Sequence, residues 1–306
     1  MINTTDLPIS TISLHHERIL VTGITGIHGW PVYQALSRLI PQEKLFGIGP
    51  PRMKNPSGRN VKPLCISDVK NLRQIRDVFK PTLVIHAGGV CDLDVCEERP
   101  RWAHRINVDG SSAVAETFSG TARTCYLSTD LVYSGNNPPS TGYAEHHRPN
   151  PLSIAGKTLQ QGEQAIMTAG RWAIIRLGLP VGASVTGDKG GLDWIESRFR
   201  RNLPVTLFTD EYRSIISCGA LARSVIEFAG SRTEGIYHLG GSRTVSLYEL
   251  GGMIIEGGKY APSLLKGITR SQERDGPPRI GNVGLNSGKI ASLLSHPVGT
   301  WRYCAS

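Results

Sequence analysis

The segment from Gly23 to Gly29, near the start of the chain, has residue types and spacing that suit binding of a phosphate group. Gly23, Gly26 and Gly29 form a G-x-x-G-x-x-G pattern between a short apolar run and a helical pattern. Glycine permits a tight turn and a close backbone approach to a pyrophosphate, while the helix N-terminus supplies N–H donors and a positive dipole. A glycine-rich turn without a ligand is the alternative. The residues expected to bind a dinucleotide here are Gly23, Thr25, Gly26, Ile27, His28 and Gly29.

Two cations follow the second expected strand. A site selective for NAD would place Asp or Glu here, against the ribose hydroxyls. The stretch from Phe46 to Lys54 contains no acid, and Arg52 and Lys54 are side chains that pair with a 2′-phosphate. We therefore expect NADP, with NAD as the alternative cofactor and ordinary surface charges as the alternative role of the two cations. Asp68, next to Val69, is placed to meet the adenine amino group or to cap a helix.

The elements that must position these residues alternate along the chain. Short apolar strands are expected at 18–22, 44–48, 61–66, 82–86, 124–128 and 172–177. Helical periodicity is expected at 31–40, 72–79, 103–118 and 152–169. This alternation predicts a parallel sheet covered on both faces, and right-handed crossovers make it a Rossmann-type doubly wound α/β fold.

The pattern loosens beyond residue 180. There we expect strands at 204–208 and 236–238 and helices at 219–229 and 247–255. We interpret residues 18–180 as a dinucleotide-binding Rossmann domain. Residues 181–306 then form mainly a smaller C-terminal substrate-binding lobe, segments of which can return to the sheet. Residues 1–17 are polar and mixed and are expected to form a flexible arm.

Composition excludes several classes of protein. Of the 306 residues, 39% are hydrophobic, and no run approaches the ~18 apolar residues of a membrane span. The formal net charge of +9 suits an anionic partner, yet no block of five like charges and no basic-aromatic motif indicates nucleic acid. The six cysteines show neither C-x-x-C nor zinc spacing, so no metal is expected. With no signal peptide visible, we expect free thiols and a cytoplasmic protein.

Further motifs occur in a recognisable order after the glycine loop. Together they resemble an extended short-chain dehydrogenase/reductase, and within that superfamily the dTDP-4-dehydrorhamnose reductase and NAD-dependent epimerase-dehydratase families, over roughly residues 18–295. The segments that carry the resemblance are Pro81–Gly89, Arg105–Gly110 with Asn107, Leu127–Gly135, Tyr143–Glu145, Pro149–Ser153, Thr209–Arg213, Gly235–Gly240 and Leu285–Lys289.

The resemblance implies roles for single residues. Ala87, Gly88 and Gly89 would line the ribose and phosphate side of the cofactor. Thr129 matches the catalytic Ser or Thr that hydrogen-bonds the substrate carbonyl, and Asp130 would flank a sugar. Tyr133 matches an aromatic position that usually packs in the core or the wall of the site, and it is a further candidate catalytic residue. The residues expected to bind a substrate, such as a nucleotide sugar, are Cys91, Tyr143 and Arg213.

One motif of that family is missing. Its chemistry depends on Tyr-x-x-x-Lys, in which the Tyr transfers the proton and the Lys lowers its pKa and holds the nicotinamide ribose. Ala155 stands at the Tyr position and Leu159 at the Lys position, and no Tyr in the chain has a Lys four residues later. Lys157 lies about 200° around the helix from the Lys position and cannot replace it.

The loss leaves three interpretations open. The slightly favoured one is an atypical oxidoreductase with relocated acid–base groups, drawn from Asp130, Tyr133, Tyr143, Cys91, His146 and His147. The second is a catalytically inactive regulatory subunit that binds NADP(H) or a sugar nucleotide, as a homodimer or with a partner enzyme. The third is a non-redox lyase or epimerase on the same scaffold. An enzyme predicts an acid or base beside position 155, whereas a binding protein predicts a closed apolar wall.

Overall fold

A seven-stranded parallel sheet forms the centre of the molecule. The computed structural model describes residues 14–53, 60–182, 185, 191–273, 275–299 and 301. The strand order is β10-β6-β5-β4-β1-β2-β3, and every neighbouring pair runs parallel. The predicted Rossmann-type doubly wound fold is confirmed by this order. The strands are β1 (Ile19–Thr22), β2 (Leu45–Gly49), β3 (Val61–Pro63), β4 (Leu83–His86), β5 (Arg123–Thr129), β6 (Trp172–Leu177) and β10 (Gly235–Leu239).

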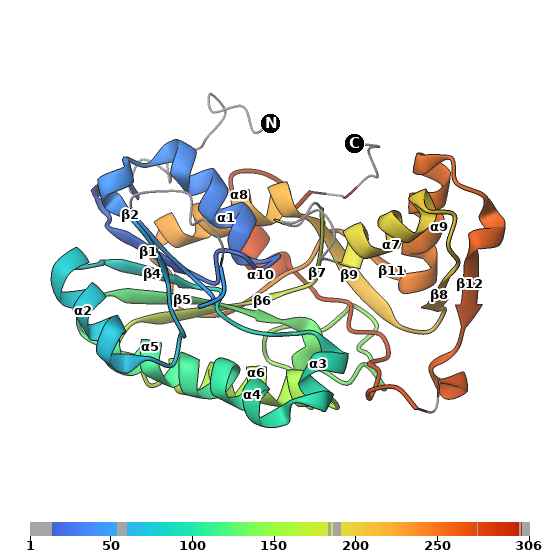
Figure 1. The fold of residues 1–306 in the computed structure, drawn as a ribbon, viewed down its shortest axis with the longest axis horizontal. Helices are drawn as coiled ribbons and strands as arrows, with labels where there is room; N and C mark the ends of the chain where they lie inside the picture. Colours follow the sequence, from blue (N-terminus) through green and yellow to red (C-terminus); the bar gives the residue numbers. More distant parts are fainter. Residues whose placement is uncertain are drawn as a thin grey trace.

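Helices cover both faces of this sheet (Figure 1). One face is covered by α1 (Gly29–Leu39) and α8 (Cys218–Ser231), whose apolar residues share a core with β1, β4 and β5. The other face is covered by α2 (Val69–Phe79), α5 (Gly110–Phe118) and α6 (Ile154–Ile166). Strands buried on both sides need apolar residues throughout, which explains the continuous apolar runs in the sequence. Among the described residues, no helix is both long and apolar enough to cross a membrane.

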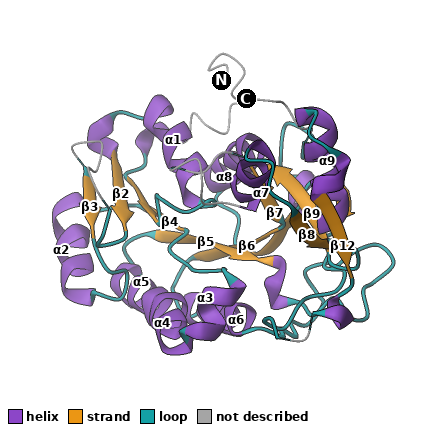
Figure 2. Cartoon of the chain, turned by 45° about the vertical axis from the view of Figure 1, so that its right-hand side comes forward, coloured by secondary structure: helices purple, strands orange, loops and turns teal. Residues whose placement is uncertain are grey.

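The C-terminal lobe lies at one end of the sheet (Figure 2). It has its own apolar core, which includes Phe199, Leu250 and Ile254. β10 comes from the same part of the chain but pairs with β6 in the large sheet. The elements of the lobe are β7 (Leu179–Val181), β9 (Tyr212–Ser217), β11 (Arg243–Ser246), β8 (Val205–Phe208), β12 (Leu265–Ile268), α7 (Gly191–Arg200) and α9 (Leu247–Gly258).

Some element boundaries differ from those expected. The strand expected at 61–66 ends at Pro63, and the last backbone bond to β2 is donated by the Leu64 N–H to the Gly49 carbonyl over 2.9 Å. The helix expected at 103–118 is divided into α4 (Pro100–His104), a π-helical segment (Arg105–Asp109) and α5. The helix α3 (Leu93–Glu98) was not expected.

Part of the expected N-terminal arm lies against the domain. Residues 1–13 are outside the described residues, whereas Leu14 is 2% exposed and belongs to the core under α1. Glu17 accepts a hydrogen bond from the Thr82 hydroxyl and pairs with Arg232. Residues 14–17 are therefore held by apolar and polar contacts.

A buried polar network joins α6 to the sheet. Glu163 of α6 and Arg176 of β6 form an ion pair with an N–O distance of 2.7 Å, and both side chains are 2% exposed. Ser128 donates to Glu163 over 2.6 Å, and Arg176 donates to the Tyr133 phenol over 2.7 Å. That phenol in turn contacts Nε2 of His238 over 3.2 Å. The network fixes α6 relative to β5, β6 and β10.

Removing one partner of this pair should lower stability strongly. We expect Arg176→Met to reduce the free energy of unfolding by about 3–5 kcal/mol, because it leaves the buried Glu163 charge unpaired. Arg73 and Glu116 form an exposed pair, with side chains 53% and 60% exposed, so Arg73→Met should cost less than about 1 kcal/mol. Urea denaturation measures both values. Equal losses in the two variants would contradict a special role for the buried pair.

Candidate functional site

The glycine loop between β1 and α1 is shaped by close backbone contacts. Gly23 has a φ of +68°. A Cβ on Gly23 would clash with the Ala87 carbonyl oxygen at the end of β4, and one on Gly29 would clash with the Gly23 carbonyl oxygen. Gly26 is exposed, and a Cβ there would lie 3.4 Å from the Gly23 oxygen. The tight turn at the N-terminus of an 11-residue helix fits a pyrophosphate.

His28 of this loop lies within the electrostatic influence of Arg213, a residue of β9 in the C-terminal lobe. It occupies the N-cap position of α1, and its side chain makes no capping hydrogen bond. Burial, with a smaller contribution from Arg213 of β9, lowers the pKa of His28 to about 4. The imidazole is therefore neutral at pH 7.

A hydrogen-bonded chain fixes the segment after β4. Thr22 and His86 are opposite each other at the ends of β1 and β4. The Thr22 hydroxyl lies 2.7 Å from Nδ1 of His86 and accepts from the Gly88 N–H over 3.1 Å. Nε2 of His86 contacts Ser111, which donates to the Asn107 carbonyl over 2.6 Å. This order of donors makes His86 a neutral imidazole protonated on Nε2.

Asn107 anchors the same segment from the other side. Its side chain accepts from the Val90 N–H over 2.7 Å and donates to the Val90 carbonyl over 2.9 Å. It also donates to the Thr158 hydroxyl of α6 over 2.8 Å. The segment Ala87–Gly89, expected beside the ribose and phosphate, is therefore held from β1 and from α6.

The residues expected near the adenosine have different surroundings. Arg52 is exposed in the turn after β2, and Lys54 is outside the described residues. Asp68 caps α2: its carboxylate accepts from the Asn71 N–H over 3.1 Å and from the Asn71 side-chain amide over 2.8 Å. Val69 is the first residue of that helix. Asp68 thus has the geometry of a helix cap, which was one of its two expected roles. The expected contact of Asp68 with adenine stays a prediction.

Asp130 and Arg213 form the charged centre of the expected substrate side. Asp130 has a fully buried side chain, and Arg213 is 11% exposed. Nε of Arg213 donates to one Asp130 oxygen over 2.6 Å, and a terminal amino group donates to the other. Cys91 lies in the field of both residues, and burial raises the pKa of its thiol. Asp130 and Arg213 are thus joined by an ion pair, and Cys91 lies within their electrostatic influence.

The other candidate proton-transfer groups have structural partners. Thr129 is 3% exposed, and its hydroxyl accepts from the Leu131 N–H over 3.2 Å. Tyr133 is fully buried, and burial raises the pKa of its phenol to about 12. Tyr143 stacks on Tyr133 with ring centroids 4.1 Å apart and contributes to the same buried wall.

The two adjacent histidines are not buried in this wall, and the His147 ring packs edge-on against Tyr143 with ring centroids 5.7 Å apart. His146 is exposed, and Nδ1 of His147 lies 2.9 Å from the Ala144 nitrogen and 3.1 Å from the Ala144 carbonyl oxygen. Within the described ranges, no group of three or more His, Cys, Asp or Glu side chains is arranged to hold a metal ion.

The position of the missing dyad is a closed apolar wall. Ala155 is 0% exposed and Leu159 is 2% exposed, in a cluster that includes Leu131 and Val132. A Cβ on Gly89 would lie 3.3 Å from Cδ2 of Leu159, so this side chain lies directly behind the expected ribose segment. Lys157 is exposed on the other side of α6.

Sequence reasoning missed two sets of residues. The Thr22–His86 pair could have been found, because both are polar residues that end apolar strands expected to be neighbours. The Glu163–Arg176 pair gave no signal, since a single Glu on a helix and a single Arg in a strand are usually surface residues. Both sets position the backbone around the site without facing a ligand.

The chain is similar to proteins of known type. A family model described as the RmlD substrate binding domain matches residues 17–305. Methionine adenosyltransferase 2 subunit beta from Bos taurus is 32% identical over 158 residues, 51% of this chain and 44% of that protein. The match thus spans less than half the length of that relative.

Two solved structures share the fold. A hypothetical dTDP-4-dehydrorhamnose reductase from Sulfolobus tokodaii has a TM-score of 0.80 and 24% identity, over 93% of this chain and 97% of that one. The dTDP-4-dehydrorhamnose reductase of Bacillus anthracis, solved in complex with NADP, has a TM-score of 0.73 and 20% identity, over 90% and 92% of the two chains. At these identities the likeness establishes the fold.

Buried neutral histidines should make stability depend on pH. Burial lowers the pKa of His86 and His238 to about 3 and that of His28 to about 4. Unfolded histidines take up protons below pH ~6.5 while the folded ones stay neutral, so the unfolded state binds more protons and stability falls as pH falls. We expect urea denaturation from pH 7 to 5 to show a loss of about 1.4 kcal/mol per pH unit for each such histidine below pH 6.5.

Two substitutions isolate this effect. His238→Gln should remove one histidine's share of the slope, whereas His146→Gln at an exposed position should leave the slope unchanged. A free energy of unfolding that is constant between pH 7 and pH 5 would contradict the neutral buried histidines.

Proposed function

Because the chain belongs to the RmlD substrate binding domain family, we propose that it binds NADP(H) and acts as a regulatory subunit rather than as a reductase. The observation that carries the proposal is the apolar wall at Ala155 and Leu159, which are 0% and 2% exposed. Reduction of a carbonyl needs a proton donor beside the hydride donor. General acid–base groups typically contribute about 10² to 10⁴ in rate, and a wall without such a group forfeits that factor.

The remaining polar groups support a non-catalytic role. The Tyr133 phenol is held by Arg176 and His238, and Asp130 is held by Arg213. The raised pKa of the Cys91 thiol keeps it protonated at neutral pH, so it is a poor base or nucleophile. Tyr133, Asp130 and Cys91 therefore each have a structural partner or an unfavourable protonation state.

The cofactor half of the site supports binding. Gly23 and Gly29 form a turn in which any Cβ would clash, and the segment after β4 is held by Thr22, His86 and Asn107. Exposed Arg52 favours the 2′-phosphate of NADP. Bound NADPH would supply a hydride, but this chain's residues offer it binding and orientation without a proton relay. The NADP complex of the Bacillus anthracis reductase supports the choice of ligand.

The regulatory role is supported by the similarity to methionine adenosyltransferase 2 subunit beta from Bos taurus. An atypical reductase remains the second candidate, because the buried Asp130–Arg213 pair with Cys91 provides polar groups on the expected substrate side. The assays below separate the two functions.

Dinucleotide binding should depend on the tip of the glycine loop. We expect Gly26→Asp to weaken NADPH binding at least 100-fold, because a carboxylate there repels the pyrophosphate, while the fold tolerates a Cβ 3.4 Å from the nearest atom. The matched control is Gly219→Asp, an exposed glycine whose Cβ would meet no atom within 4 Å. Titration of NADPH fluorescence measures both. Equal affinity in wild type and Gly26→Asp would remove the loop from the binding site.

Hydride transfer should be absent although NADPH binds. We expect the purified protein to oxidise NADPH no faster than buffer when a 4-keto sugar nucleotide is present, measured by absorbance at saturating cofactor. It should also co-elute with a methionine adenosyltransferase catalytic chain in gel filtration. Turnover within about 100-fold of a working reductase would contradict the proposal, since acid–base loss alone costs about that much or more. Failure to co-elute would reject this partner.

A further inference from the structure

A separate cavity lies where strands of the seven-stranded sheet begin, at the end of the strands opposite the candidate site. It is formed at the amino ends of β4, β5 and β6, next to the C-terminal end of α8, and has a volume of about 420 Å³. β5 has seven residues and runs from Arg123 at this cavity to Thr129 at the candidate site. At ~3.3 Å per residue the two sites are about 20 Å apart, so the cavity is not part of the dinucleotide site.

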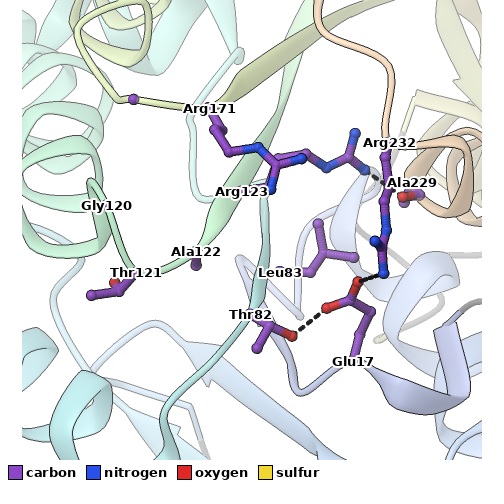
Figure 3. Close-up of a pocket in the computed structure, with 11 residues that line it drawn as sticks. Glu17, Thr82, Leu83, Gly120, Thr121, Ala122, Arg123, Arg171, Ala229 and Arg232 are labelled. Atoms are coloured by element: carbon purple, nitrogen blue, oxygen red, sulfur yellow. Dashed lines mark hydrogen bonds and ion pairs between the residues drawn. The ribbon is translucent and has the colours of Figure 1, made fainter.

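Three arginines line this cavity, and Figure 3 shows their side chains gathered around it. They are Arg123 at the start of β5, Arg171 just before β6, and Arg232 just after α8. Glu17 is the one acid among the lining residues, and it pairs with Arg232 over 3.0 Å. Glu234, which is not a lining residue, pairs with Arg171 over 3.3 Å, so the three arginines and two glutamates leave one net positive charge at the cavity.

Arg123 is a buried cation without a carboxylate partner among the described residues. It is 4% exposed, and its guanidinium donates to the carbonyls of Thr233, over 3.0 Å, and Ala229. Ala229 belongs to the last turn of α8, whose end carries about half an elementary negative charge, and Thr233 lies just beyond that helix. Burial, reinforced by Arg171, lowers the pKa of Arg123. Its positive charge is therefore compensated only in part.

The other two arginines have donors to spare. Arg171 uses Nε on Glu234, over 3.3 Å, and Arg232 uses one terminal nitrogen on Glu17. Across the described part of the chain, the remaining guanidinium nitrogens of both residues have no hydrogen-bond partner. Their side chains are 60% and 61% exposed, so they can reorient toward a ligand. Guanidinium forks of this kind match carboxylate and phosphate oxygens.

We infer that this cavity binds a small polyanion that carries two or more phosphate or carboxylate groups. The lining contains no aromatic side chain, which disfavours a stacked nucleotide base. Its volume is near the lower end of the range for ligand pockets, which favours a compact ligand. The concave shape favours a small molecule over an extended acidic peptide.

Calorimetric titration with pyrophosphate and, separately, citrate tests this site. At constant ionic strength we expect one-to-one binding of at least one probe to the wild-type protein. Binding of pyrophosphate alone identifies a phosphate ligand, binding of citrate alone a carboxylate ligand, and binding of both the shared chemistry. No binding of either probe at millimolar concentration would overturn the inference.

Two variants connect any binding to the cavity. Arg171→Gln with Arg232→Gln should weaken binding at least tenfold, because two charge-assisted contacts are lost. Gly170→Leu should weaken it by filling the cavity without changing charge, since a Cβ on Gly170 lies 3.7 Å from its nearest neighbour. Arg73→Gln, from the exposed pair with Glu116, is the control and should bind as the wild type does.

The glycine loop is the competing location for pyrophosphate. Gly26→Asp should retain probe binding if the arginine-lined cavity is the site. Loss of probe binding in Gly26→Asp, with retention in the double arginine variant, would overturn the inference and leave the dinucleotide proposal intact. Thermal unfolding of each variant shows whether it is folded.

Discussion

The buried ion pair between Glu163 and Arg176 is the interaction on which the candidate site depends. Removing two charges from water costs several kcal/mol per ion, so such a pair persists only where its geometry and further hydrogen bonds are good. Here Ser128, Tyr133 and His238 provide those bonds. Because Glu163 belongs to α6, the pair sets the position of the helix that carries Ala155 and Leu159. The apolar wall is thus fixed by polar contacts one to two turns away.

This arrangement separates the two halves of the site. The cofactor half is stabilised by contacts of Thr22, His86 and Asn107, and none of those contacts uses the side chain at position 155 or 159. The contacts that hold the backbone around the expected dinucleotide therefore do not depend on the side chains at positions 155 and 159. The expected substrate side instead contains Asp130 and Arg213, which are paired with each other.

Features that depend on residues close together in the sequence could be predicted, whereas contacts between distant segments could not. The glycine loop and strands such as β1 and β4 could be predicted because their sequence signals are local. Each strand is a short apolar run, and the turn after β1 requires glycine. Short strands of the lobe, such as β9 and β11, depend on pairing between segments about 30 residues apart, and their exposed residues blur the alternation. The hydrogen bond between Tyr133 and His238 could not be predicted, because the two residues are 105 positions apart in the sequence.

The parallel sheet also explains where the basic residues gather. All strands begin at one edge, and the helices that return to them end there, so the helix C-termini present partial negative charge at that edge. Arg123 donates to the Ala229 carbonyl in the last turn of α8 and to the Thr233 carbonyl beyond it. Three arginines with Glu17 and Glu234 leave one net positive charge around the cavity, which the half charge of one helix end does not balance. Part of the formal charge of +9 is therefore concentrated at one place in the fold, far from the glycine loop that also attracts anions.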